Sequence, residues 1–217
     1  MDEVLLEHLL EYGTSLVYEA AGQVGGMDHT IRPLYPGARL CGRALTVRTT
    51  GGDNLAIHRA LALAEPGTVL VVDVGGYLDA GHWGEITTAC AQARGLRGAV
   101  INGSVRDVLA IKGRRFPIFA AGVCMRAAGK AILGEIGVPI MCGGVEVSPG
   151  DLVLGDEDGV LVLPPQRLPG LLRAVEERRR REVQILGGIE AGRTTIDLLG
   201  LAGSPNRSAN TSQGEVL

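Results

Sequence analysis

The sequence is poor in aromatic residues and has no closely paired cysteines. One tryptophan, four tyrosines and two phenylalanines stand beside 33 glycines among 217 residues, so we expect a core of Val, Leu, Ile and Ala joined by many tight turns. The four cysteines form no Cys-x-x-Cys motif, which excludes the usual zinc motifs and a disulfide framework. We therefore expect Cys41, Cys90, Cys124 and Cys142 to be buried free thiols.

Strong charge of one sign and long hydrophobic runs are also lacking. A formal net charge of -3 gives no basic face of the kind that nucleic acid attracts, so we expect no nucleic-acid partner. No apolar run approaches the roughly 20 residues that a membrane span requires, and the N-terminus shows no secretory segment. These absences predict a cytoplasmic protein with no membrane attachment, and they favour small-molecule chemistry.

The middle of the chain alternates strand and helix patterns. A β-branched run at 69–74 predicts a strand buried on both faces, and small residues from about 84 to 94 predict a helix. A strand at 98–103, a helix at 105–112 and a strand at 116–119 follow. This alternation predicts parallel strands joined by right-handed crossovers.

From Val138 onward the pattern changes to short strands separated by turns, which is typical of antiparallel β structure. A long polar helix is predicted at 166–190, with an apolar stripe that includes Val183 and Leu186. We predict an α/β fold: a single domain over 1–202 with a mixed central sheet flanked by helices and an antiparallel β portion. Residues 203–217, rich in Ser, Asn and Gly, are predicted to be a flexible C-terminal tail.

A helix start and a strand end lie twenty residues apart in the predicted fold. The turn 84–87 opens the helix, so its free N–H groups can bind a carboxylate, and Gly84 lets a ligand come close. Arg106 leaves the next strand and can clamp the same carboxylate through two hydrogen bonds. Asp107 and Glu85 offer the hard oxygen ligands that suit Mg²⁺ or Mn²⁺. Together they predict a site for a 2-oxo acid and a metal ion.

Ordinary structural roles explain the same residues. The helix dipole favours Glu85 in a first turn without any ligand. An Arg106–Asp107 pair at a strand end can be a surface ion pair of little energetic value. From the spacing alone, both interpretations stay open.

The sequence resembles the RraA-like family over roughly residues 12 to 200. That family contains the class II 4-hydroxy-4-methyl-2-oxoglutarate/4-carboxy-4-hydroxy-2-oxoadipate aldolases, which also decarboxylate oxaloacetate. The matching segments are Gly52-Asp53-Asn54-Leu55, Gly75-Gly76, Trp83-Gly84-Glu85, Gly103-Ser104-Val105-Arg106-Asp107, Gly143-Gly144-Val145, Pro149-Gly150-Asp151 and Asp156-Glu157-Asp158-Gly159-Val160.

The resemblance implies a role for each residue of the predicted site. Asp107 would be the one direct protein ligand of a divalent metal, Mg²⁺ or Mn²⁺, and Glu85 would orient a metal-bound water. Arg106 would bind the carboxylate and keto oxygen of a small 2-oxo acid substrate. The backbone amides of Ile86 and Thr87 would take the same carboxylate. The resemblance further implies a homotrimer, or a hexamer, with active sites between subunits.

The chain departs from the family at three positions. Ala110 stands where an acidic residue is common, Asn102 replaces an Asp, and the Glu donated by a neighbouring subunit has only Glu182 as its candidate. The ribonuclease regulators of the family lack the metal-binding Asp, so Asp107 favours a lyase over a regulator. A regulator of ribonuclease activity stays the alternative, and an enzyme acting on another 2-oxo or sugar acid is a third hypothesis.

Two histidines lie near the predicted site in the sequence. His82 is placed either in the pocket or as an exposed or hydrogen-bonded residue near a turn, and His58 as a packing or surface residue.

Overall fold

The computed structural model describes residues 3–201 and divides the chain into two units, one ending at Val175 and one beginning at Glu176. A nine-stranded sheet forms the centre of the first unit, with the order β1-β6-β5-β3-β2-β10-β11 and with β4 paired to β5 and β7 to β2. The strands are β1 (Arg32–Pro33), β2 (Leu40–Arg48), β3 (Thr68–Asp73), β4 (Gly81–Trp83), β5 (Gly98–Val105), β6 (Ile118–Val123), β7 (Glu135–Ile136), β10 (Leu152–Asp156) and β11 (Gly159–Leu163).

The sheet is mixed, as the sequence predicted. Strands β2, β3, β5 and β6 are parallel, whereas β10 and β11 form an antiparallel pair that continues the sheet beside β2. The run from Val69 to Val72 is fully buried because both faces of the sheet are covered. The predicted fold class is therefore confirmed for this unit.

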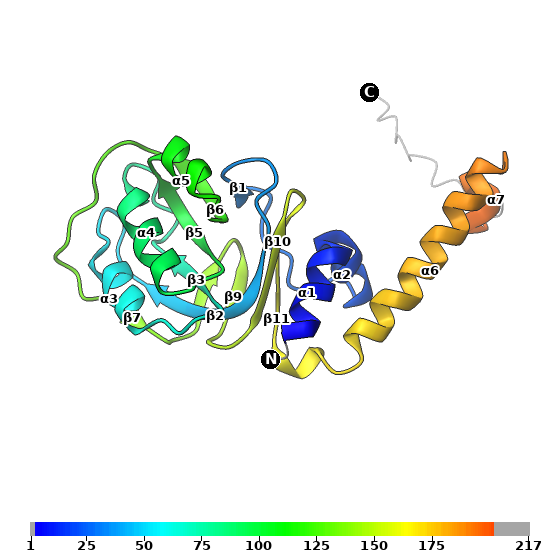
Figure 1. Cartoon of the computed structure of the whole chain (residues 1–217), viewed down its shortest axis with the longest axis horizontal. Coiled ribbons are helices and arrows are strands. Elements are labelled where there is room, and N and C mark those ends of the chain that lie inside the picture. The colour runs from blue at the N-terminus through cyan, green and yellow to red at the C-terminus, as the bar shows by residue number, and fades with distance from the viewer. Residues whose placement is uncertain (1–2, 202–217) are drawn as a thin grey trace, which may run out of the picture. The chain divides into compact units, whose positions relative to one another are not determined.

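Three groups of elements cover the sheet (Figure 1). On one face pack α3 (Leu55–Leu63), α4 (Glu85–Ala93) and α5 (Val108–Arg114), which bury Ile57, Ala91 and Ile111. The other face is covered by the two-stranded sheet of β8 (Ile140–Cys142) and β9 (Val145–Val147). The helices α1 (Glu3–Tyr12) and α2 (Thr14–Ala20) pack on β10 and β11. The helices α4 and α5, which carry the predicted site, thus lie together on one face.

Strand β4 was absent from the sequence prediction. Its three residues are all buried, and it pairs in parallel with the end of β5. Three residues are too few to show an alternating pattern, so this strand could not be recognised from the sequence. It matters because it brings Trp83 and the start of α4 beside Arg106.

The predicted helix at 166–190 is two elements in the structure. A 3₁₀ turn at Pro165–Arg167 precedes α6 (Leu171–Glu190), and Gly170 between them has a φ of 77°. Of the predicted apolar stripe, Leu171 and Val175 are buried, whereas Val183 and Leu186 are exposed. In the second unit α6 continues with ion pairs between neighbouring turns and is followed by α7 (Thr195–Leu199).

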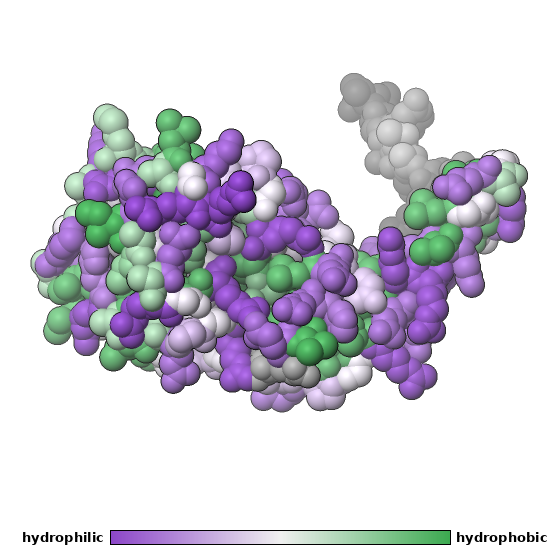
Figure 2. All heavy atoms as spheres, viewed as in Figure 1, coloured by the Kyte–Doolittle hydropathy of each residue, from purple (hydrophilic) through white to green (hydrophobic). Residues whose placement is uncertain are grey.

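The predicted tail at 203–217 lies outside the described residues. Within 3–201, no helix is both long and apolar enough to cross a membrane. Figure 2 shows hydrophilic residues over much of the visible face of the first unit, interrupted by separate hydrophobic ones.

All four cysteines are free thiols, as predicted. Cys41 and Cys142 are buried, and burial raises the pKa of each thiol to about 12. Cys90 is exposed and Cys124 half-buried, so the prediction of burial was wrong for these two.

Candidate functional site

A cavity of about 150 Å³ lies where β4, α4 and the end of β5 meet. A cavity of this size suits a small acid rather than a nucleotide. Its lining includes five of the six residues predicted from the sequence: Gly84, Ile86, Thr87, Arg106 and Asp107.

Asp107 occupies an unusual backbone conformation at the start of α5. Its φ of 61° and ψ of 38° lie in the left-handed region, which Asp and Asn tolerate better than most residues. Such a conformation costs of order 1–3 kcal/mol and is often found at functional sites. In this conformation the Asp107 side chain lines the cavity and accepts a hydrogen bond from the start of α4.

The Asp107 carboxylate is held by the start of α4 and lies beside Arg106. Its Oδ2 accepts a hydrogen bond of 3.0 Å from the backbone N–H of Glu85 and lies 3.7 Å from Nε of Arg106. Arg106 is itself tied to β4, because its backbone N–H donates to the carbonyl of Trp83 at 2.8 Å. One carboxylate, one guanidinium and one helix start therefore converge on a single point.

Gly84 makes this convergence sterically feasible. A Cβ added at Gly84 would collide with Oδ2 of Asp107 and would lie 3.1 Å from Cγ of Arg106. The φ of Gly84 is −156°, which any residue adopts, so the requirement is for space and not for backbone freedom. A Cβ at Gly81 would likewise lie 2.9 Å from Cβ of Arg106. Both glycines let the Arg106–Asp107 turn lie against the start of α4.

Side-chain hydroxyl groups fix the first turn of α4. Thr87 Oγ1 accepts from the N–H of Gly84 at 2.9 Å and lies 2.8 Å from its carbonyl. Thr88 Oγ1 accepts from the indole N–H of Trp83 at 2.7 Å and donates to the same carbonyl at 2.9 Å. Because both threonines are buried, the helix start is held rigidly.

The N–H groups of this turn are the predicted carboxylate cradle. The first amides of a helix have no acceptor within the helix. The N–H of Glu85 is taken by Asp107, while those of Ile86 and Thr87 follow it along the turn that lines the cavity. Their position suits the predicted role of binding a substrate carboxylate.

The Glu85 side chain is placed elsewhere. Its Oε1 accepts hydrogen bonds from Nη2 and Nε of Arg114, at 3.0 and 3.3 Å, and Glu85 does not line the cavity. Arg114 lies at the end of α5, so this pair joins α4 to α5. The structure therefore brings five of the six predicted residues together. The sixth, Glu85, has its carboxylate paired with Arg114 instead.

The start of α3 and a distant segment also line the cavity, through Asn54, His58 and Lys130. The sequence left Asn54 open as either a wall of the pocket beside Arg106 or a helix cap, and it placed neither His58 nor Lys130 in the site. Asn54 is 8 % exposed; its Nδ2 donates to the carbonyl of His82 at 2.9 Å, and its Oδ1 has no hydrogen-bond partner among residues 3–201. Burial and the charge of Lys130 lower the pKa of His58, which favours its neutral imidazole. The four-residue spacing of Asn54 and His58 at the start of α3 was a usable signal, whereas nothing in the sequence pointed to Lys130.

Asp53 fixes these residues in place. Its carboxylate accepts from the N–H of Leu55 at 2.9 Å and from the N–H of Ala131 at 2.6 Å, and it is buried. Burial raises the pKa of this carboxyl, but the hydrogen bonds from Ala131 and Leu55 and the charge of Lys130 outweigh burial and lower it overall. Asp53 thus joins the start of α3 to the segment that carries Lys130.

His82 is a structural residue. It is fully buried, its Nε2 accepts from the N–H of Gly52 at 2.9 Å, and its Nδ1 lies 3.2 Å from the carbonyl of Ser104. These contacts fit a neutral ring with the proton on Nδ1. Burial lowers the pKa of His82, although Ser104 and Asp53 partly oppose that effect. Of the positions predicted for His82, the structure selects the hydrogen-bonded one, and burial excludes the exposed one.

The donor set at the cavity suits a hard cation that keeps most of its waters. Among residues 3–201 no three His, Cys, Asp or Glu side chains group as a metal cage, and Asp107 supplies the one carboxylate on the cavity wall. Mg²⁺ is commonly bound through one or two carboxylates with waters and substrate, whereas structural zinc needs four protein ligands. The residues present therefore fit Mg²⁺ or Mn²⁺. Ala110, half-buried on α5, offers no further oxygen.

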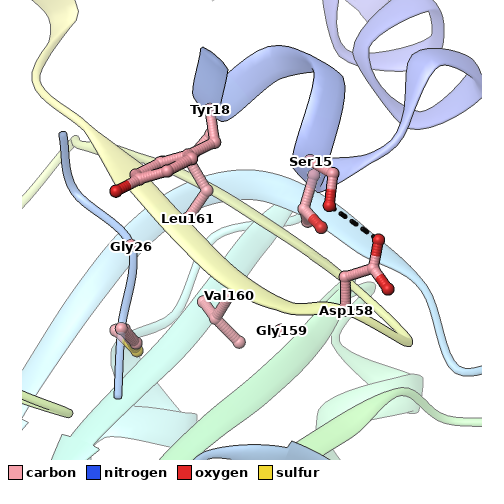
Figure 3. A pocket seen from close by; sticks show the side chains of 9 residues that line it. Ser15, Tyr18, Gly26, Asp158, Gly159, Val160 and Leu161 are labelled. Carbon is pink, nitrogen blue, oxygen red and sulfur yellow. Dashed lines mark hydrogen bonds between the residues drawn. The ribbon is translucent and has the colours of Figure 1, made fainter. Parts of the chain in front are cut away.

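A larger cavity of about 240 Å³ lies between α2 and the β10–β11 hairpin (Figure 3). The polar side chains on its wall already have partners: Ser15 Oγ donates to Asp158 at 2.7 Å, and Thr14 Oγ1 donates to Asp156, outside the cavity, at 2.5 Å. Because these carboxylates are already occupied, this cavity is a weaker candidate for an active site.

The fold and the site define an α/β protein with a small cavity at which one carboxylate, one guanidinium and the start of a helix converge. The RraA-like family model, described as Aldolase/RraA, matches residues 14–162, and the chain belongs to this family.

Three relatives illustrate the range of the family. A Halalkalibacterium halodurans protein named "Putative 4-hydroxy-4-methyl-2-oxoglutarate aldolase" is 37% identical over 166 residues, which cover 76% of this chain and 79% of that protein. The crystal structure of an uncharacterized Pseudomonas syringae protein matches with a TM-score of 0.83 and 27% identity, covering 93% of this chain and 95% of that one. The structure of the RNA-processing inhibitor RraA from Thermus thermophilus matches with a TM-score of 0.65 and 31% identity, covering 70% of this chain and 92% of that one.

Proposed function

We propose that this protein is a divalent-metal-dependent carbon–carbon lyase. It cleaves 4-hydroxy-2-oxo acids of the 4-hydroxy-4-methyl-2-oxoglutarate type to pyruvate and decarboxylates oxaloacetate. The observation that carries the proposal is the convergence of Asp107, Arg106 and the first turn of α4 on one small cavity. The name of the Halalkalibacterium halodurans relative supports the same reaction class.

Different cavity residues bind the carboxylate and the keto oxygen of a 2-oxo acid. Arg106 is the cation beside the helix start, so it binds the substrate carboxylate and the neighbouring keto oxygen through its N–H groups. The amides of Ile86 and Thr87 bind the same carboxylate at the positive end of α4. A metal ion held by Asp107 would supply a positive charge that stabilises negative charge on the keto oxygen.

The bond changes follow from this placement. A base takes the proton of the C4 hydroxyl, the C3–C4 bond breaks, and its electron pair moves toward C2 and the keto oxygen beside Arg106. Protonation of C3 then gives pyruvate, and the other fragment leaves as a second oxo compound. With oxaloacetate the same bond breaks and carbon dioxide leaves. In both cases Arg106 stabilises the charge that develops on the oxygen.

Pyruvate release tests the proposal. The full chain is incubated with Mg²⁺ and either 4-hydroxy-4-methyl-2-oxoglutarate or oxaloacetate, and pyruvate is measured with and without a chelator. We expect release from both that the chelator stops and added Mg²⁺ restores. Absence of chelator-sensitive release from either substrate would refute the proposal.

The similarity to the Thermus thermophilus RNA-processing inhibitor favours a second candidate, a non-catalytic regulator of ribonuclease activity. This candidate predicts that the purified chain inhibits a ribonuclease and that Asp107→Asn inhibits equally well. The lyase predicts that Asp107→Asn removes pyruvate release while the fold remains intact.

The proposal includes assembly as a homotrimer, or a hexamer, with the active site completed by a neighbouring subunit. Glu182, which pairs with Arg179 at 3.7 Å, is the proposed acidic residue from that subunit. Light scattering gives the subunit number. Mixing Asp107→Asn and Glu182→Gln subunits tests whether two subunits form one active site. Mixed assemblies should regain the pyruvate release that neither variant shows alone.

A further inference from the structure

A third cavity, of about 410 Å³, lies at the opposite end of α5 from Asp107. Its walls are Tyr35, Arg39, Lys112 and Arg115, together with backbone around Gly37 and Pro117. It shares no lining residue with the Arg106 cavity. At 410 Å³ it falls in the range of small-molecule binding sites, which is about 300–1,000 Å³.

Three cations line this cavity, and within residues 3–201 none of them forms an ion pair: Arg39, Lys112 and Arg115. The nearby acid is Glu157, whose carboxylate already accepts from the N–H of Gly37 at 2.8 Å. The charges on the wall are therefore positive in excess.

Arg115 adopts a backbone conformation that residues other than glycine disfavour. Its φ of 54° and ψ of 32° put it in the left-handed region at the end of α5, where glycine is the usual residue. An L side chain there costs roughly 1–2 kcal/mol. Tyr35 lines the same cavity, where burial raises the pKa of its hydroxyl group and the charge of Arg115 partly opposes that effect. The cavity wall thus combines a strained arginine with a tyrosine hydroxyl group.

The helix dipole explains only part of this arrangement. Cations near a helix C-terminus are favoured by the dipole, and this accounts for Lys112 and Arg115. It does not account for Arg39, which comes from the segment before β2 and faces the same cavity. Two separate segments therefore supply cations to one space.

We propose that this cavity binds a small multivalent oxyanion, either phosphate-bearing or polycarboxylate. Arg39 and Arg115 provide the planar N–H pairs that bind such groups bidentately, Lys112 adds a point charge, and the Tyr35 hydroxyl group donates a hydrogen bond. The site is independent of the proposed lyase chemistry.

Calorimetric titration of the full chain at constant ionic strength tests this site. Inorganic pyrophosphate and citrate are the two probes, and acetate is the monovalent comparison. We expect saturable one-to-one binding of at least one probe: pyrophosphate alone identifies phosphate groups, and citrate alone identifies carboxylates. Acetate binding as tight as both probes, or no saturable binding of either at millimolar concentration, would overturn the proposal.

Arg115→Gly is the decisive variant because glycine suits the left-handed backbone. The melting temperature should not fall, yet probe affinity should drop about tenfold or more. Arg39→Gln should weaken binding similarly.

Arg43→Gln removes the same charge from an exposed position on β2 and should bind as the wild type does. Arg106→Gln should also keep binding, which separates this site from the lyase cavity. Loss of probe binding in Arg106→Gln, together with full binding in Arg115→Gly, would refute the assignment of the anion site to this cavity.

Discussion

Gly84→Ala is predicted to damage the site without damaging the fold. The added Cβ would collide with Oδ2 of Asp107 and press on Arg106, with 3.1 Å to its Cγ and 3.3 Å to its Nε. The carboxylate must then leave the N–H of Glu85, and a hydrogen bond to a charged group contributes about 1.5–3 kcal/mol. If that placement is needed for the reaction, kcat/KM for pyruvate release should fall roughly 10- to 150-fold.

Gly113→Ala is the matched control. It makes the same change inside α5, where an added Cβ meets no atom within 4 Å, and Gly113 has no positive φ. We expect a gain of about 0.4–1 kcal/mol in the free energy of unfolding and unchanged kcat/KM. The assay is pyruvate release under Mg²⁺, with thermal unfolding run in parallel. Equal activity of Gly84→Ala and wild type at equal stability would show that the contact between Gly84 and Asp107 does not matter for the chemistry.

Three further predictions concern the surroundings of the site. Asp53→Ala should lower the free energy of unfolding in urea by about 3 kcal/mol, since two backbone N–H groups lose a charged acceptor; a loss under about 1 kcal/mol would contradict this. The pKa of His82 is depressed, so the unfolded chain binds more protons below pH 6.5; the melting temperature should drop as pH falls below 6.5, with a smaller slope in His82→Gln. Arg114→Gln should free the Glu85 carboxylate and tighten Mg²⁺ binding in calorimetry, with a stability change below about 1 kcal/mol because the pair is half-exposed; weaker Mg²⁺ binding would argue against this.

Much of the site could be predicted because its parts are local in sequence. The helix start at Gly84 and the Arg106–Asp107 turn each follow from a short pattern, and parallel crossovers bring such turns to one edge of a sheet. The continuous strand at β3 was equally clear, since only burial on both faces explains its β-branched run.

The missed features depend on contacts between distant residues. The pairing of Glu85 with Arg114 exists because α4 packs beside α5, which no local pattern states. Lys130 reaches the cavity because the Asp53 carboxylate binds Ala131, 78 residues away. His82 looked like a turn residue because β4 is too short to recognise, and pairing with β5 buries it.

The lyase account depends most on Asp107, and Asp107→Asn tests it most directly. Asparagine tolerates the left-handed backbone at this position and keeps an acceptor oxygen for the N–H of Glu85, so the fold and melting temperature should not change. Removing the negative charge should reduce Mg²⁺-dependent pyruvate release from 4-hydroxy-4-methyl-2-oxoglutarate by about 100-fold or more. Full chelator-sensitive release by Asp107→Asn would contradict the account.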